Sequence, residues 1–494
     1  MSSYYILLTI VVYFALLLLI ARITNKHREN SNSAFFKGNN QSLWYVVAFG
    51  MIGASVSGVT FVSVPGMVRS IDFTYIQMCI GFFFGYIIVA KVLLPTYYKL
   101  NLVSIYSYLG IRIGSKARAT GSFFFLLSRM LGAAARLYLV CLILHTYVFN
   151  KWNVPFWVLA TGIILFIWLY THKSGVKTIV WTDTLLTFCL LSALVLIIIY
   201  VAKDLNLHSI AQTWQVISHN PHFRIFEFND WHSTQNFYKQ FFSGIFIVIV
   251  MTGLDQDMMQ KNLSCHNLHD AQKNMYCYGF SFLPINFLFL FLGLLLLILS
   301  VQMHISLPAN GDEILPSFAV TGLLGKPVLI LFVLGIVAAA FSSADSALTS
   351  LTTIFCVDVL HMDKLEDNAH SVKLREYTHI GISIVMIMTI CLFHLLNNRS
   401  IIDAIYTLAS YTYGPLLGLF CFGLFTKRTT NDNAVPYIAV SSPIICYLLN
   451  AASIYYWKYK FGYEILMLNG MLTFAGLYII SHKSQFIKLK ENGN

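Results

Sequence analysis

Long apolar runs recur along the whole chain, and they decide what it can fold into. A helix that crosses a lipid bilayer needs ~20 consecutive, mostly apolar residues. Thirteen runs of about this kind are found, too many for a protein held by a single membrane anchor. They lie at about 4–22, 44–66, 73–97, 119–148, 156–171, 179–202, 237–255, 275–302, 327–357, 378–396, 403–425, 434–455 and 463–481. The sequence therefore predicts an all-α integral membrane protein with 13 transmembrane helices in a lipid bilayer.

Little of the chain remains for a soluble domain. Hydrophobic residues make up 57% of the sequence and charged residues only 11%, against about 25% charged residues in soluble proteins. The longest stretch between runs, residues 203–236, is too short to fold as a domain of its own. The first run lacks a basic leader and a small-residue cleavage site, so we expect a retained helix and not a signal peptide.

The distribution of basic residues predicts the orientation in the membrane. The net charge of +11 is compatible with nucleic-acid binding, but twenty basic residues follow the odd-numbered runs and about eight lie on the other side. Short segments rich in lysine and arginine stay in the cytoplasm. Lys261, just after the seventh run, is counted in the cytoplasmic group. The pattern predicts a multi-pass protein of the inner (cell) membrane with an outside N-terminus, a cytoplasmic C-terminus and no nucleic-acid partner.

Motifs for catalysis or for a structural metal are absent from the sequence. The nine cysteines are scattered without a CxxC spacing, so neither a disulfide framework nor a zinc site is indicated. There is no HExxH motif and no Walker phosphate-binding motif, and no nucleophile–base constellation emerges. The chain is therefore not predicted to be an enzyme or an ATP-driven pump.

The stretch "VAAAFSSADSALTSLTT", residues 337–353, carries a carboxylate in the middle of the ninth apolar run. An ionisable group near the bilayer centre costs ~2.5–3.5 kcal/mol on insertion scales. Ser342, Asp345 and Ser346 share a helix face because residues three and four apart lie together, and Ser343 lies beside them. Hydroxyl, carboxylate and carbonyl oxygens suit hard cations, which favours a cation site. The alternative is serine-rich helix packing with Asp345 as a protonated hydrogen-bond donor.

The second run, "AFGMIGASVSGVTFVSVPGM", is interrupted by glycines and a proline and carries several hydroxyls. Glycine weakens a helix, and unwound backbone at membrane depth is tolerated only where it is buried or lines a cavity. Transporters use such discontinuous helices to bind substrates and coupling ions. The alternative is a glycine-rich face for close helix packing, and the sequence leaves both interpretations open.

Further charged residues stand inside or at the ends of other runs. Arg129 and Arg136 are seven residues apart on nearly the same helix face; Arg129 is placed to reach partly toward the cytoplasm, and Arg136 is deeper. Such an arginine could clamp a carboxylate with its planar fork or form an internal salt bridge with Asp183 or Asp255. Asp183 itself could instead be an interfacial residue. We expect Asp255 and Asp257 to close a gate or to cap a helix at the cytoplasmic end.

Five pieces of the sequence, in this order, resemble the sodium:solute symporter family. They are "GASVSGVTFVSVPG", "VWTD", "LDQDMMQKN", "AAAFSSADSALT" and "GLFTKR". The resemblance implies the five-plus-five inverted-repeat fold of the leucine transporter. It divides the single transporter domain, 1–494, into a leading helix, two repeats and trailing helices, at 4–22, about 44–202, about 237–425 and 434–481.

The resemblance also implies a sodium ion between the broken second run and the ninth run. Its ligands would be the backbone carbonyls and hydroxyls of Gly53, Val56, Ala339, Ser342 and Ser343. In the sialic acid branch a second sodium binds one turn further along, so a second site for sodium or a proton is expected here. Its residues would be Asp183, Ser342, Asp345 and Ser346. This chain departs from that branch in having Asp345 where the branch has a serine.

The implied solute site lies beside the interrupted helix. Its residues would be Ser55, Ser57, Thr60, Tyr75 and Arg136. Arg136 stands at the same distance before the WTD motif as the arginine that holds the carboxylate in sialic acid symporters, which indicates a carboxylated solute, either an organic anion or an amino acid. Cys79 stands where that branch has a glutamine.

The sequence thus predicts a sodium-coupled symporter that imports a small organic solute by alternating access, with Na⁺ and the solute as its ligands. Two alternatives stay open at this point. One is a proton-coupled transporter that uses Asp345 and Asp183 as proton carriers. The other is a substrate sensor on the same fold, for which the tail after Ser481 is expected to be too short to form a signalling domain.

Overall fold

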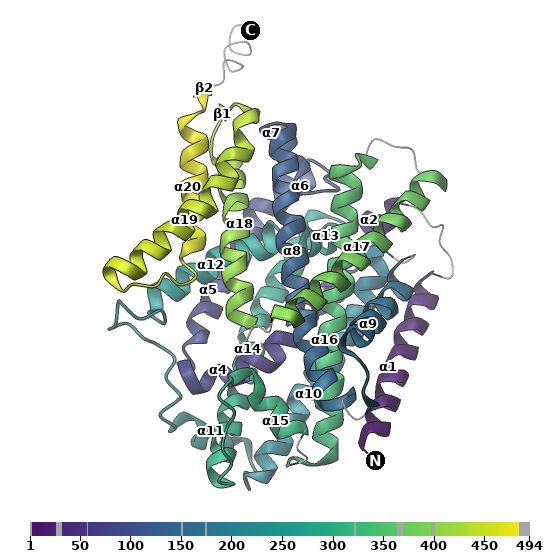
Figure 1. Cartoon of the computed structure of the whole chain (residues 1–494), viewed down its shortest axis with the longest axis vertical. Coiled ribbons are helices and arrows are strands. Elements are labelled where there is room, and N and C mark those ends of the chain that lie inside the picture. Colours follow the sequence, from purple (N-terminus) through teal and green to yellow (C-terminus); the bar gives the residue numbers. More distant parts are fainter. Residues whose placement is uncertain are drawn as a thin grey trace.

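The computed structural model describes an almost entirely helical protein. It describes residues 2–25, 32–56, 58–149, 152–172, 175–320, 323–362, 369–396 and 401–483. Ser57, one of the predicted solute ligands, lies outside these ranges. The two short strands β1 (Arg428–Thr429) and β2 (His482–Lys483) pair antiparallel at the top of the molecule in the view of Figure 1.

The α-helices follow one another along the chain with mostly short connections. They are α1 (Ser2–Asn25), α2 (Asn32–Lys37), α3 (Trp44–Ser55), α4 (Gly58–Ile71), α5 (Tyr75–Ile88), α6 (Leu94–Lys99), α7 (Ser107–Arg112), α8 (Ser115–Leu144), α9 (Phe156–Thr171), α10 (Gly175–Asp204), α11 (Ile210–Ser218), α12 (Phe237–Val248), α13 (Gln256–Leu263), α14 (Leu268–Gln302), α15 (Ile314–Val320), α16 (Gly325–Ile354), α17 (Ala369–Leu396), α18 (Ile401–Phe425), α19 (Val435–Trp457) and α20 (Ile465–Ile479). Short 3-10 and π-helical segments extend or precede several of them. They are η1 (Gly38–Asn40), η2 (Val89–Leu93), η3 (His145–Phe149), η5 (Ile249–Gly253), η6 (Gly311–Glu313), η7 (Phe355–Val359) and η9 (Asp432–Ala434).

Within the described ranges, eight helices are long and apolar enough to cross a membrane, or up to ten if each of two bent pairs counts as one span. Three shorter apolar helices lie at Val11–Ile20, Phe156–Thr171 and Ile465–Ile479. The prediction of an all-α protein with many apolar spans is confirmed. The count of thirteen stays a prediction, because length and composition alone do not show which of the shorter helices cross.

Two bent helix pairs interrupt the otherwise straight spans. The first is α3 with α4, bent by 60°. The second joins the segment α12–η5 to α13 with a bend of 63°. α13 begins after Asp255, whose side chain accepts a hydrogen bond from the Asp257 amide at 2.9 Å, so Asp255 caps the start of α13 and not the end of the seventh apolar run. A short polar helix therefore follows the break and extends to Leu263, although the apolar pattern of the sequence ends at residue 255.

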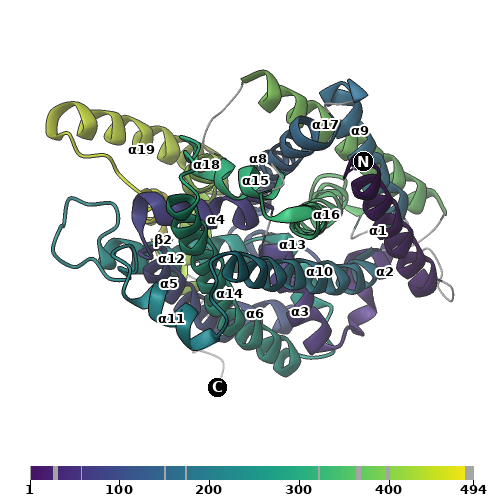
Figure 2. The same ribbon diagram turned by 90° about the horizontal axis from the view of Figure 1, so that it is seen from below.

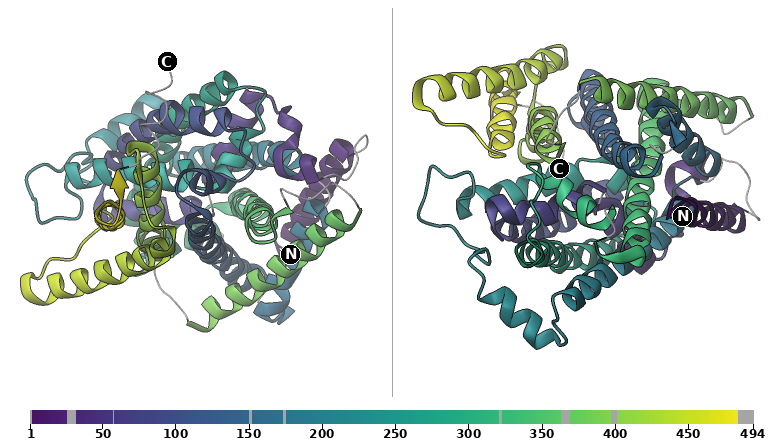
Figure 3. Two further views of the ribbon diagram at one scale, coloured as in Figure 1. Left: turned by 90° about the horizontal axis from the view of Figure 1, so that it is seen from above. Right: turned by 60° about the horizontal axis from the view of Figure 1, so that its bottom comes forward.

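α16 lies at the centre of the bundle, and 78% of its most apolar 18-residue stretch is buried inside the protein. It contacts α3, α4, α8 and α10, while α1 lies at the margin beside α9, α10 and α16 (Figure 2). By contrast, only 22% of the corresponding 18-residue stretch is buried in each of α17 and α19. α19 projects from the side of the bundle (Figure 3). The polar stretch of α16 is therefore enclosed by other helices.

Lys261 is not a loop residue, although the sequence places it among the basic residues of the cytoplasmic side. The structure places it in α13, where it is 3% exposed. The reason is the missed break: because the helix resumes after Asp255, Lys261 belongs to a buried helix and not to a loop.

Glycines let several helices approach to backbone contact. A Cβ atom on Gly81 of α5 would meet the carbonyl of Phe241 on α12, and one on Gly244 of α12 would meet the carbonyl of Met78. Close approach through small residues is a common way to pack membrane helices. The α5–α12 contact thus depends on the absence of side chains on both sides.

We predict that Gly81→Ala or Gly244→Ala lowers the stability of the purified protein, because a methyl group would have to displace a backbone carbonyl. Overpacking of this kind costs ~1–3 kcal/mol. Gly132→Ala on α8 is the control, because a Cβ atom there meets nothing within 4 Å. Thermal unfolding in detergent measures the effect, and equal melting temperatures for Gly81→Ala and Gly132→Ala would contradict the prediction.

Candidate functional site

The buried polar residues of α16 point into the protein and not toward lipid. Ser342, Ser343, Asp345 and Ser346 are each at most 2% exposed. The hydroxyls of Ser343 and Ser346 have no hydrogen-bond partner among the described residues. Because the large majority of buried polar groups in proteins are hydrogen-bonded, these two oxygens are available to a ligand.

α3 packs against both α16 and α10. Its last carbonyl groups have no partner within the helix, as at any helix end. The predicted sodium ligands on the two helices are Gly53, Val56, Ala339, Ser342 and Ser343. The structure therefore brings together the two helices that carry them, and backbone and hydroxyl oxygens suit a hard cation such as Na⁺.

Gly50 and Gly53 explain how α3 comes so close to its neighbours. A Cβ atom on Gly50 would lie 3.1 Å from the Cβ atom of Asp183, and one on Gly53 would meet the side chain of Thr187. Both partners are on α10. The two interpretations of the second apolar run are thus both realised, because this helix is broken and its glycines also form a packing face.

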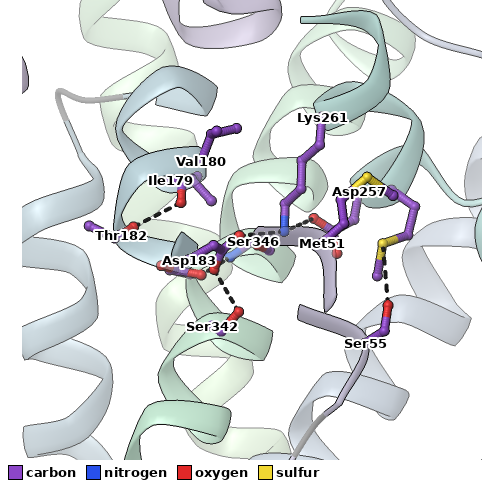
Figure 4. Close-up of polar contacts among 12 residues, drawn as sticks. Met51, Ser55, Ile179, Val180, Thr182, Asp183, Asp257, Lys261, Ser342 and Ser346 are labelled. Carbon is purple, nitrogen blue, oxygen red and sulfur yellow. Dashed lines mark hydrogen bonds and ion pairs between the residues drawn. The ribbon is translucent and has the colours of Figure 1, made fainter. Parts of the chain in front are cut away.

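Asp183 is fully buried, and it is bound by a cation and a hydroxyl (Figure 4). The Nζ atom of Lys261 lies 2.7 Å from its Oδ2 atom. The Ser342 hydroxyl donates a hydrogen bond to its Oδ1 atom at 2.6 Å. The Asp183 side chain is 0% exposed, so it is enclosed by protein and does not face lipid or water.

Asp345 has different partners from Asp183, although the two carboxylates interact electrostatically. Its Oδ2 atom accepts a hydrogen bond from the Tyr170 hydroxyl at 3.0 Å, and its Oδ1 atom accepts one from the Ser346 amide at 2.6 Å. Among the described residues, no lysine, arginine or histidine nitrogen lies within 4.0 Å of the Asp345 carboxylate. The four residues of the expected second site are therefore neighbours. Of its two carboxylates, only Asp183 contacts a cationic side chain.

A second buried ion-pair group joins α8 to the break before α13. The Arg129 guanidinium donates to the Asp257 carboxylate, and its Nη1 atom lies 3.7 Å from Asp255. The Tyr413 hydroxyl donates to Asp255 at 2.6 Å. Arg129 is 5% exposed, so the expectation that it reaches toward the cytoplasm is wrong. Its positive charge is matched inside the protein instead.

A cavity of about 90 Å³ lies beside the bend between α3 and α4. Ser55, Thr60 and Arg136 line it, as do Tyr86 and Tyr278. The hydroxyls of these two tyrosines are joined by a hydrogen bond of 2.9 Å, and the Ser55 hydroxyl bonds to Tyr278. Three of the five predicted solute residues therefore line one cavity, and one of the three, Arg136, is cationic.

The other two predicted solute residues are not placed there. Tyr75 lines a separate cavity of about 420 Å³, together with Ser63 and Gly66 of α4. Ser57 lies outside the described residues. The two cavities lie along the same bent helix, because the first contains residues at the start of α4 and the second contains residues further along it.

Several residues at this site escaped the sequence analysis. Lys261, Tyr170 and Tyr278 contact predicted site residues, but each stands in a different run or beyond the assigned end of one. A signal existed only for Lys261, because the glycine and the capping aspartate in "TGLDQD" indicate that a new helix begins there. Nothing in the spacing of the tyrosines distinguishes them from ordinary membrane aromatics.

Comparisons with known proteins give a consistent result. A profile of the sodium:solute symporter family matches residues 35–437. The chain is 24% identical to a sodium/sialic acid symporter of Aliivibrio fischeri, over 90% of this chain and 88% of the relative. It is 26% identical to a sodium/sialic acid symporter of Proteus mirabilis, over 86% and 85%. A solved Na⁺-coupled sialic acid symporter in a substrate-bound outward-open state superposes with a TM-score of 0.81 at 22% identity, covering 98% of this chain and 99% of that one.

We predict that Arg129→Met strongly destabilises the protein, because it leaves the buried Asp257 carboxylate with only the Lys261 Nζ atom, at 4.0 Å, as a cationic neighbour. Breaking a buried ion pair on one side costs ~3–5 kcal/mol. Arg224→Met is the matched control: Arg224 pairs with Asp72 and Glu227 but its side chain is 54% exposed, and exposed pairs contribute at most ~1 kcal/mol. Denaturation in detergent is the measurement, and similar losses for the two variants would be evidence against a buried pair.

Proposed function

The chain belongs to the sodium:solute symporter family, and on that premise we propose that it imports a small carboxylated solute together with sodium. Its family and its relatives are transporters, so the chain is a transporter and not an enzyme. Na⁺ is its coupling ion, and a small organic molecule is its cargo. The proposal assigns the ion and the solute to neighbouring sites at the bend between α3 and α4.

The observation that carries the proposal is the Ser343 hydroxyl. It is buried in the central helix, it has no hydrogen-bond partner among the described residues, and the broken helix α3 contacts its helix. We assign the sodium site to the carbonyls of Gly53, Val56 and Ala339 and the hydroxyls of Ser342 and Ser343. A cation bound there would replace its hydration shell with protein oxygens and would link the broken helix to α16.

This link supplies a mechanism for alternating access. Sodium at the site would order the end of α3 and stabilise the outward-facing state, and the solute would then complete its pocket. Opening to the cytoplasm would release sodium into a compartment that is poor in sodium. A membrane potential of 100 mV adds ~2.3 kcal/mol per translocated charge, so even one sodium ion gives a large concentrating power.

The solute site is proposed at the cavity lined by Ser55, Thr60 and Arg136, with Ser57 as a further ligand, whereas Tyr75 lines the separate cavity along α4. A guanidinium in a cavity wall can hold a carboxylate with two parallel hydrogen bonds. Two relatives named above are sodium/sialic acid symporters, which supports a sialic acid or a related organic anion as the solute.

We further propose that the thirteen apolar runs are all membrane spans in the lipid bilayer of the inner (cell) membrane, with the N-terminus outside and the C-terminus in the cytoplasm. The proposed layout is a leading helix at 4–22, repeats at about 44–202 and 237–425, and trailing helices within 434–481. The two bent pairs support it, because each stands at the start of one proposed repeat. In inverted-repeat transporters, discontinuous helices in corresponding positions bind the substrate and the ions.

Asp183, Ser342, Asp345 and Ser346 are proposed as a second cation site, which a sodium ion, a proton or a cationic side chain can fill. The contact between Asp183 and Ser342 supports it, because Ser342 also belongs to the first site. Occupancy of one site would then be felt at the other through a single hydroxyl.

We predict that Ser343→Ala raises the sodium concentration needed for half-maximal uptake by about tenfold or more. Losing an interaction with a charged group costs roughly 1.5–3 kcal/mol, and 1.4 kcal/mol corresponds to a factor of ten. Ser350→Ala is the control, because Ser350 is on the same buried helix but its hydroxyl bonds back to the Ala347 carbonyl. Uptake of labelled sialic acid into proteoliposomes at graded sodium concentrations is the measurement.

An unchanged sodium requirement in Ser343→Ala would show that the site is misplaced. The same assay distinguishes the proton-coupled alternative: at fixed pH, uptake driven equally well without sodium would exclude sodium coupling altogether.

For the solute site, we predict that Arg136→Gln weakens binding of carboxylated solutes by roughly 30-fold or more. Truncating one partner of a buried charged hydrogen bond costs ~2–5 kcal/mol. Arg224→Gln, which removes an exposed arginine far along the chain, should leave binding as in the wild type. Calorimetric titration with sialic acid, amino acids and monocarboxylates in saturating sodium is the measurement, and full-strength binding by Arg136→Gln would rule out the clamp.

A further inference from the structure

Lys261 is a buried cation that the proposed transport cycle does not use. Its side chain is 3% exposed, and its Nζ atom lies 2.7 Å from Asp183 and 4.0 Å from Asp257. It comes from α13, the short helix that follows the second break, and points toward α10 and α16 (Figure 4). It therefore contacts one oxygen of Asp183, whereas Ser342, a proposed sodium ligand, contacts the other.

Burying an ammonium group is costly unless it is paired and hydrogen-bonded. Here the pairing is direct, since the Lys261 Nζ atom donates to Asp183 Oδ2 while the Ser342 hydroxyl donates to Asp183 Oδ1. Both oxygens of this carboxylate thus have a donor. Lys261 also interacts electrostatically with Asp345, so its single positive charge acts on both carboxylates of the proposed second site.

A free sodium ion at Asp183 would stand next to this ammonium group. Two unit positive charges a few ångströms apart repel strongly in a protein interior, where screening by water is weak. The ammonium already supplies what a second sodium ion would supply, namely one positive charge against the Asp183 carboxylate.

We propose, on the basis of the proposed function, that Lys261 is a covalently attached cation that takes the place of a second sodium ion at Asp183. The protein then binds one free sodium ion, at the site of Ser342 and Ser343. The ion pair also serves that site: because the Ser342 hydrogen is donated to Asp183, the oxygen lone pairs of Ser342 are left for the first sodium ion. Lys261 is thus a positioning residue for sodium binding, acting through Asp183 and Ser342.

The test counts sodium ions on the full-length protein in detergent without any solute. Equilibrium binding of ²²Na⁺ should give one ion per wild-type molecule and one for Lys261→Arg, which keeps the charge. Lys261→Met removes the attached cation and leaves Asp183 and Asp345 to recruit a free one, so it should bind two. The double variant Asp183→Asn with Lys261→Met removes both charges and should return to one.

The outcomes separate this inference from the proposed function. Two ions on the wild-type protein, or a single ion on a folded Lys261→Met variant, would overturn the role of Lys261 while leaving sodium symport intact. No bound sodium at all would instead overturn the proposed function.

A further variant keeps the inference testable if Lys261→Met does not fold. Asp183→Asn should still bind one ion, with weaker affinity because Ser342 then donates to a neutral amide oxygen instead of a carboxylate. If the wild type binds two ions and Asp183→Asn binds only one, then Asp183 holds a free sodium ion in the wild type. That result would overturn the role of Lys261.

Discussion

The structure around the bend depends on the requirement that charges buried away from water be matched. Lys261 and Arg129 are both almost fully enclosed, and each contacts an aspartate from another segment of the chain. Removing either partner would leave an uncompensated charge in a medium that solvates it poorly. These pairs therefore connect α13 both to α10 and to α8. The helices that surround the proposed ion site are held in position by charges and not only by apolar packing.

The two bent helices make this arrangement chemically useful. A continuous helix keeps its backbone oxygens in its own hydrogen bonds, whereas a helix end in the protein interior has carbonyl groups without partners. α3 contacts α16, and the glycines at positions 50 and 53 let it pack closely on α10. Backbone oxygens, the hydroxyls of α16 and the Asp183–Lys261 pair thus meet in one small region. Ser342 belongs both to the proposed sodium ligands and to the Asp183 contact.

Much of this could be predicted from individual residues. The carboxylate and hydroxyls in the ninth apolar run indicated a buried polar site, and the structure buries Asp345 and its neighbours in the central helix. The glycines of the second run indicated a break, which lies between α3 and α4. The break before α13 was missed, because the apolar pattern simply ends at Asp255 and a short polar helix has no periodic apolar signal. That error placed Lys261 in a loop.

The sequence by itself determined the class of protein: its repeated apolar runs can be stable only in a membrane, and its polar residues at membrane depth must serve a purpose inside the bundle. Only the tertiary structure decided which charges meet. Lys261 and Asp183 are 78 residues apart in the chain, and Arg129 and Asp257 are 128 apart. Local patterns report on neighbours within a few turns, whereas these pairs form because separate helices pack side by side. A cation that looked like a loop charge became the counter-ion of a buried carboxylate for that reason.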